Sequence, residues 1–179
     1  MYAVDLSPTP LAYAAFNAGR LGVGGRVSPL RGSWYEPLAA AGAPRLAGVL
    51  SNPPYIAAAE MPGLQAEVGR HEPALALCGG EGLGLDALLP ICTGAARVLR
   101  PGGFLALETA GGEQALYVAE LLRHLRHSAV AEDARNGWRG GDSEGGDGGA
   151  DPERPAFADV RVRRDLRGVD RFVTATAAP

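Results

Sequence analysis

The residues best suited to chemistry form a short run, Ser51-Asn52-Pro53-Pro54-Tyr55, directly after an apolar stretch. The Asn52 carboxamide carries hydrogen-bond donors and an acceptor, and a proline carbonyl accepts hydrogen bonds on a chain of restricted φ. The Tyr55 ring offers a flat wall with a polar tip. Together these groups predict a slot that clamps a planar amide or the amino edge of a purine. A double-proline turn capped by Asn52 is the simpler interpretation.

The element that must position this run is a predicted buried strand, Leu46–Ser51, which ends at the prolines because they donate no ladder hydrogen bond. Open α/β sheets bind their ligands at the carboxyl ends of such strands. Strands and helices alternate along the chain, which is typical of an α/β fold with parallel pairing where helices intervene. The other predicted strands are 2–4, 26–30, 104–107, 129–132 and 168–176, and the predicted helices are 8–20, 85–99 and 113–127.

Composition narrows the class of protein. The chain has 179 residues, of which 17 are basic and 20 acidic, and all the basic residues are arginine. The net charge of −3 argues against direct, bulk electrostatic binding of nucleic acid. No apolar run reaches the roughly 18 residues of a membrane span, and no signal peptide is apparent. We therefore expect no membrane insertion and no secretion.

The cysteines and histidines predict no metal site and no disulfide framework. Cys78 and Cys92 form no CxxC pair, and His124 and His127 have no apparent third ligand. Sparse cysteine fits a reducing compartment or an organelle interior, so we expect a cytoplasmic or organellar protein, in a mitochondrion or plastid. Residues 136–156 are rich in Gly and Asp without an apolar pattern, and they predict a disordered insertion.

The Asn52 run belongs to a larger pattern, which resembles the HemK/PrmC family of release-factor glutamine methyltransferases. The most specific part pairs Ser51-Asn52-Pro53-Pro54-Tyr55-Ile56 with the later Glu72-Pro73-Ala74-Leu75-Ala76-Leu77. The tetrapeptide Asn52–Tyr55 alone is shared with adenine-N6 nucleic-acid methyltransferases. The resemblance also includes Ala3–Ser7, Asn17-Ala18, Gly32–Trp34, Glu36–Leu38, Gly79-Gly80, Gly82-Leu83, Leu99–Glu108 and Asp170–Val173.

The resemblance implies a Rossmann-like class I methyltransferase sheet that uses S-adenosyl-L-methionine. The implied reaction is N5-methylation of the glutamine in the Gly-Gly-Gln loop of a peptide-chain release factor, which is then the protein partner. The implied catalytic and substrate-binding residues are Asn52, Pro53, Pro54 and Tyr55, with Glu72 as a further substrate-binding residue. The implied cofactor-binding residues are Asp5, Ser33, Trp34 and Asn52.

Two of the cofactor residues have other interpretations. Asp5 follows a strand, where a carboxylate accepts hydrogen bonds from both ribose hydroxyls of a nucleoside, but it also suits the positive end of a helix dipole. At Ser33, related enzymes often carry an aspartate that contacts the adenine amino group. A serine hydroxyl accepts this hydrogen bond more weakly.

The family's acidic-Gly-x-Gly-x-Gly loop would precede residue 1, so residues 1–179 are interpreted as a partial, N-terminally truncated catalytic domain. Its sheet would lack the first strand, and the two neighbouring strands would show unpaired edges. The run Gly79–Gly84 is a second, weaker candidate for a cofactor loop. An adenine-N6 DNA or RNA methyltransferase, or an inactive fragment of either enzyme, remains the alternative function.

Overall fold

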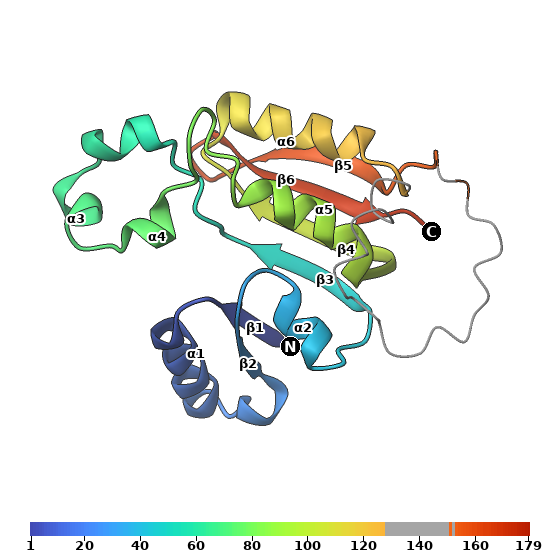
Figure 1. Cartoon of the computed structure of the whole chain (residues 1–179), viewed down its shortest axis with the longest axis horizontal. Helices are drawn as coiled ribbons and strands as arrows, with labels where there is room; N and C mark the ends of the chain where they lie inside the picture. The colour runs from blue at the N-terminus through green and yellow to red at the C-terminus, as the bar shows by residue number, and fades with distance from the viewer. Residues whose placement is uncertain (128–150, 152) are drawn as a thin grey trace. The chain divides into compact units, whose positions relative to one another are not determined.

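The computed structural model describes residues 1–127, 151 and 153–179, which form two compact units (Figure 1). Unit 1 is residues 1–45, and unit 2 is the described chain from residue 46 onward. The predicted strand 129–132 and most of the predicted insertion at 136–156 lie outside the described residues. Within the described ranges, no helix has the length and apolar character needed to cross a membrane.

Unit 1 is a strand–helix–strand motif. Its two strands pair in parallel, with Tyr2 opposite Ser28 and Asp5 opposite Arg31. The first helix begins after Ser7 with proline in its first turn, where a missing N–H costs nothing. The elements are β1 (Tyr2–Asp5), α1 (Pro8–Arg20), η1 (Gly24–Arg26), β2 (Ser28–Arg31) and α2 (Glu36–Ala40).

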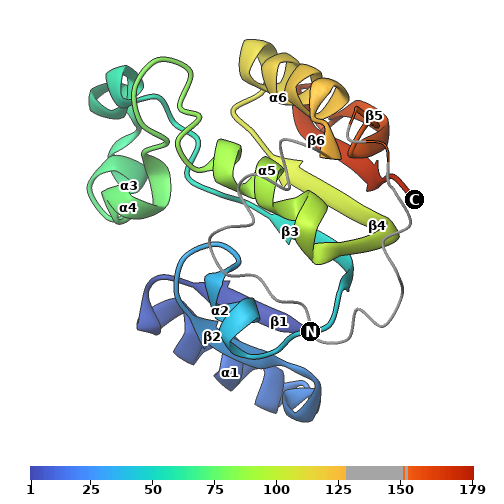
Figure 2. The same cartoon turned by 45° about the vertical axis from the view of Figure 1, so that its right-hand side comes forward.

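Unit 2 is a four-stranded sheet in the order β3-β4-β6-β5, in which β3 and β4 are parallel and the other pairs antiparallel. In Figure 2, α5 lies over β4 and α6 lies over β5 and β6, and these pairs are in contact. The elements are β3 (Leu46–Ser51), η2 (Ala58–Gly63), α3 (Ala66–Gly69), α4 (Ala74–Leu77), α5 (Leu88–Val98), β4 (Leu99–Glu108), α6 (Gly112–His124), β5 (Phe157–Arg164) and β6 (Asp170–Ala177).

The core of unit 2 lies between one face of this sheet and the two long helices. Alternate residues of β4 and β6 are fully buried, because successive side chains of a strand point to opposite faces. Residues spaced by three or four positions on α5 and α6 are buried in the same way. The core includes Leu88, Cys92, Ala95, Leu105, Leu107, Val118, Leu122, Val173 and Ala175.

The solvent exposure of β3 differs from the sequence prediction. Leu46–Ser51 forms the predicted strand, but it is not buried, since Leu50 is 81% exposed. Within the described chain, β3 pairs with β4 alone and β1 pairs with β2 alone. These are the two strands for which the sequence predicted an unpaired edge. A strand with only one neighbour leaves the groups along its other edge exposed to solvent.

Two other strands differ from the sequence predictions. β4 begins at Leu99 rather than 104, and residues 100–103 form an irregularity in its pairing with β3. β5 was not predicted, although its valines alternate with arginines in the pattern of a half-exposed strand. Near the expected end of the insertion, Pro155 bridges to Arg126 and Ala156 is 1% exposed, so the chain packs on unit 2 before residue 157.

The buried face of α6 gives a direct test of this core. Leu122 is fully buried, whereas Leu116 on the same helix is 59% exposed. Leu122→Ala removes buried methyl groups and leaves a cavity, so it should lower the free energy of unfolding by about 2–5 kcal/mol. Leu116→Ala is the matched control and should cost well under 1 kcal/mol. Urea denaturation of both variants measures the difference, and equal losses would contradict this packing.

Candidate active site

The Asn52–Tyr55 turn leaves the sheet at the carboxyl end of β3, as the sequence predicted. Asn52 is exposed, Pro53 is buried, and Pro54 and Tyr55 are half-buried. The turn therefore presents the carboxamide to solvent while its prolines and the tyrosine are partly covered by protein. An exposed amide next to partly buried residues can bind a small planar group.

The Tyr55 ring is fixed through its hydroxyl. The hydroxyl donates a hydrogen bond of 3.1 Å to Oε1 of Glu108, the last residue of β4. Burial raises the pKa of Tyr55, and the negative charge of Glu108 and this hydrogen bond raise it further, against an opposing effect of Arg171. The tyrosine is thus held neutral, and its polar tip is directed to Glu108.

The Tyr55 backbone is fixed by a second group. Nε2 of Gln114, in the first turn of α6, donates a hydrogen bond of 2.8 Å to the Tyr55 carbonyl. Ile56 continues the turn by bridging in parallel to Cys78, with its N–H donating to the Leu77 carbonyl at 2.9 Å. Both ends of Tyr55 are therefore tied to neighbouring elements of unit 2.

The glycines of the 79–84 run pack against this turn. A Cβ atom at Gly84 would lie 2.5 Å from the Tyr55 carbonyl oxygen, and one at Gly79 would lie 2.8 Å from Tyr55 Cα. Gly84 also has a φ of +68°, which side chains rarely adopt. These glycines let two backbones touch, which favours a structural role over the alternative that the run is a cofactor loop.

The predicted nucleoside-binding residues belong to unit 1 and cluster at one end of its sheet. Asp5 ends β1, and Ser33 and Trp34 follow the parallel neighbour β2; the Gly32 N–H donates to the Asp5 carbonyl at 3.1 Å. One carboxylate oxygen of Asp5 accepts the Ser7 N–H at 2.8 Å. This bond supports the helix-start interpretation of Asp5 and leaves the carboxylate a second oxygen with acceptor capacity.

Trp34 has an unusual backbone. Its φ is +47°, although it is a bulky residue, and the residue is 39% exposed. Such a conformation costs free energy and persists only when its surroundings enforce it. The strained residue lies beside two other predicted binding residues, Asp5 and Ser33. It therefore supports the prediction that this end of the unit 1 sheet is a binding site.

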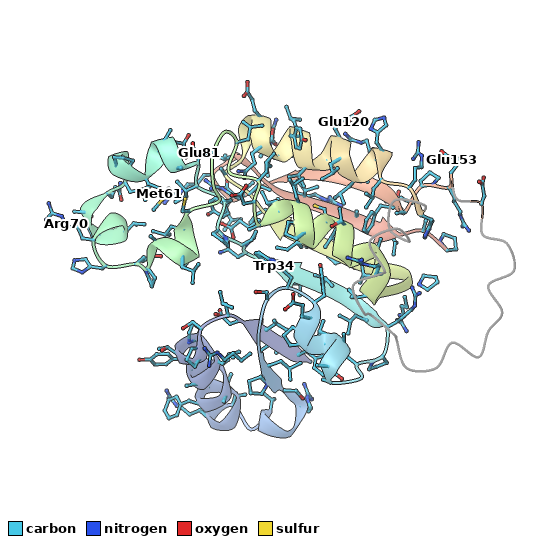
Figure 3. All side chains as sticks on the ribbon, in the orientation of Figure 1. Trp34, Met61, Arg70, Glu81, Glu120 and Glu153 are labelled. Carbon is cyan, nitrogen blue, oxygen red and sulfur yellow. The ribbon has the colours of Figure 1, made fainter. Side chains whose placement is uncertain are left out.

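Glu72 lies apart from the turn in the chain of helical segments between β3 and α5. It is exposed and sits between α3 and α4, where its N–H donates to the Val68 carbonyl at 2.9 Å. Figure 3 shows Arg70 of the same segment directed away from the sheet. No contact joins Glu72 to the Asn52–Tyr55 turn among the hydrogen bonds of the described residues.

Two residues that the sequence analysis gave no role hold the turn in place, Glu108 and Gln114. The signals were present in the sequence. Glu108 directly follows the predicted strand 104–107, and Gln114 falls on the apolar side of α6, in helical register with Val118 and Leu122. A polar residue at a core position must find hydrogen-bond partners. Across the part of the chain that is described, no group of His, Cys, Asp and Glu is suited to a metal ion.

Comparison with known proteins gives this arrangement its context. The chain is 50% identical over 173 residues to the release factor glutamine methyltransferase of Cereibacter sphaeroides, covering 97% of this chain and 49% of that protein. It is 45% identical over 130 residues to the one of Gloeobacter violaceus, covering 73% of this chain and 44% of that protein. The chain is therefore similar to release factor glutamine methyltransferases over almost its whole length.

A third relative also matches nearly the whole chain. The enzyme of that name from Synechocystis is 37% identical over 175 residues, 98% of this chain and 48% of its own length. The chain thus spans about half the length of the curated relatives it matches. No family model matches it. The family expectation from the sequence is confirmed, and the α/β class agrees with the observed sheets and helices.

The close approach at Gly84 is testable with a matched neighbour. Gly82 also has a positive φ, of +61°, but a Cβ atom there meets nothing within 4 Å. Gly82→Ala should therefore cost only backbone strain, about 1–2 kcal/mol of unfolding free energy. Gly84→Ala adds a clash with the Tyr55 carbonyl and should cost clearly more, as measured by urea denaturation. Equal costs would show that the two backbones are free to separate.

The Tyr55 hydroxyl gives a pH prediction. Because the folded pKa is raised, the folded state holds this proton more tightly than the unfolded state, whose tyrosine titrates near pH 10. The stabilisation is complete below about pH 10 and is lost as the pH rises through the folded pKa. The difference in unfolding free energy between the wild type and Tyr55→Phe should therefore narrow above pH 10. A difference that widens there would contradict the raised pKa of the Tyr55 hydroxyl, which burial and Glu108 together produce.

Proposed function

We propose that the protein carrying this chain methylates the N5 nitrogen of a glutamine in the Gly-Gly-Gln loop of a peptide-chain release factor, with S-adenosyl-L-methionine as methyl donor. The observation that carries the proposal is the Asn52–Tyr55 turn at the end of β3, with Asn52 exposed and Tyr55 held at both ends. The shared name of the relatives supports the same activity.

The turn addresses the weak point of this reaction. An amide nitrogen is a poor nucleophile because its lone pair is delocalised. The Asn52 carboxamide oxygen and the Pro53 carbonyl each accept one hydrogen of the substrate amide, which orients the nitrogen and favours the positive charge that develops on it. The Tyr55 ring forms one wall of the slot, and Pro54 restricts the backbone between Pro53 and Tyr55.

The cofactor supplies a methyl group on a positively charged sulfonium. When bound, S-adenosyl-L-methionine would supply this methyl group to the amide nitrogen held by Asn52 and Pro53, and the amide would lose one of its own protons to water. No strongly tuned general base is required, since the proton leaves after the attack. Holding the nitrogen at near-attack distance lowers much of the barrier.

The residues of unit 1 fit the nucleoside part of this cofactor by their chemistry. Asp5 would accept hydrogen bonds from the ribose hydroxyls, Ser33 would accept one from the adenine amino group, and Trp34 would cover the base. Asn52 is the fourth proposed cofactor-binding residue, beside its role on the substrate. Glu72, on the exposed segment between α3 and α4, is the proposed contact with the release factor.

The proposed substrate also indicates the cellular compartment of the protein. Release factors act where translation terminates, so we propose the cytoplasm or the interior of a mitochondrion or plastid. An adenine-N6 methyltransferase would use the same slot, but the net charge of −3 disfavours a nucleic-acid substrate. Binding assays with duplex nucleic acid and with S-adenosyl-L-methionine separate this alternative, and an inactive fragment, from the proposed enzyme.

The proposed role of Asn52 predicts a large kinetic effect. In the full-length protein, Asn52→Ala should lower methyl transfer to the release factor by about 100-fold or more, because a positioned acceptor of the reacting amide is lost. The affinity for S-adenosyl-L-methionine should change far less. The matched control is Asn17→Ala, an exposed asparagine on α1 with no proposed role. Near-normal turnover of Asn52→Ala in a radiolabelled methyl-transfer assay would refute the amide clamp.

A further inference from the structure

Gln114 is a buried polar residue that the proposed chemistry does not use. It lies in the first turn of α6 and is 4% exposed, among core residues such as Ala115 and Val118. A carboxamide removed from water is stabilising only when its donors and acceptor are all satisfied. Its partners therefore show what the residue is there to hold.

Both ends of the Gln114 carboxamide are engaged. Oε1 accepts the Ala110 N–H at 2.7 Å, which fixes the side chain to the β4–α6 connection. Nε2 faces three backbone carbonyls: Tyr55 at 2.8 Å, Gly84 at 3.3 Å, and Leu83 in a shorter contact. An amide NH2 has two hydrogens, so one of them is shared between the adjacent carbonyls of Leu83 and Gly84.

These carbonyls come from two different loops. Tyr55 ends the turn after β3, whereas Leu83 and Gly84 belong to the glycine run that precedes α5. The two loops also exchange backbone hydrogen bonds, from Gly79 N–H to the Ile56 carbonyl and from Ala58 N–H to the Gly80 carbonyl, both at 2.8 Å. Gln114 is thus the side chain that joins both loops to the helix.

The donor character of Gln114 is specific. Three carbonyl oxygens repel a carboxylate, and an apolar side chain would leave them without this donor in a buried place. Glu108 holds the ring of Tyr55 and Gln114 holds its carbonyl, so the tyrosine is fixed at two points on the same β4–α6 corner. A slot that must place a nitrogen to within a fraction of an ångström depends on such support.

We propose that Gln114 is a positioning residue for the Asn52–Tyr55 slot, locking that turn and the Gly79–Gly84 loop into one rigid body. Its effect on catalysis rests on the proposed methyltransferase function, whereas its effect on the two loops does not. Gln114 does not touch the substrate; it acts through the backbone of Tyr55.

The first test is amide hydrogen exchange on the chain itself. Gln114→Glu keeps the size and the acceptor but removes the NH2 donor. It should speed exchange at Ile56, Ala58 and Gly79 by about tenfold or more, because the loops open locally. Exchange in the β5–β6 hairpin should not change. The matched control is Gln65→Glu, the same substitution at an exposed position, which should leave exchange in both loops unchanged.

The second test is steady-state methylation of the release factor by the full-length protein. Gln114→Glu should lower kcat by at least about tenfold with little change in the KM for S-adenosyl-L-methionine, since it disturbs only the slot. A general loss of folding would instead reduce the active fraction without the selective exchange pattern. Should Gln114→Glu show no cooperative thermal melt, Gln114→Asn replaces it under the same criteria, because it keeps the amide but shortens its reach.

The outcomes separate the two proposals. Unchanged exchange in both loops overturns the role of Gln114, whatever the activity. Faster exchange with unchanged kcat shows that the loops are joined but that catalysis does not depend on it, which overturns the positioning role. Absence of methyl transfer in the wild-type protein overturns the proposed function, while the exchange data still decide whether Gln114 joins the loops.

Discussion

The site of unit 2 depends on how a backbone that leaves a sheet keeps its hydrogen bonds. Pro53 and Pro54 donate none, so the chain must depart from β4 at this point. The polar groups that follow are partly buried and need other partners. They find them in Gln114, in the segment before Gly79, and in the glycine run itself. The turn is therefore rigid because neighbouring segments of the chain replace the missing strand partner.

The same constraint explains which side chains surround the turn. Close contact between two backbones requires glycine at positions 79 and 84, and the three carbonyls around Nε2 require a donor at 114. Tyr55 then needs only one further partner, Glu108, to fix its ring. Chemistry-bearing and supporting residues are thus distributed over three stretches of sequence that are far apart in the chain.

The sequence predicted elements that have a local periodic pattern, but it did not predict contacts between residues far apart in the chain. The strand before Asn52 and the helices at α5 and α6 follow from apolar periodicity, and Asn52–Tyr55 from its residue types. β5 was missed although its valines alternate with arginines, which is the pattern of a half-exposed strand. Gln114 was missed because its partners are backbone carbonyls 31 and 59 residues away. Side-chain-to-backbone bonds of that kind leave no pattern in a sequence; only the polar residue on an apolar helix face hints at them.

The two cysteines differ in a way that makes the turn accessible to spectroscopy. Cys92 is fully buried on α5, and burial raises its pKa to about 12, so its reactive thiolate is scarce at neutral pH. Cys78 is partly exposed, and its backbone forms a β-bridge with Ile56, the residue after Tyr55. A thiol-directed fluorophore or spin label should therefore attach selectively to Cys78 without any engineered cysteine. The native chain thus carries its own attachment point for a reporter beside the Asn52–Tyr55 turn.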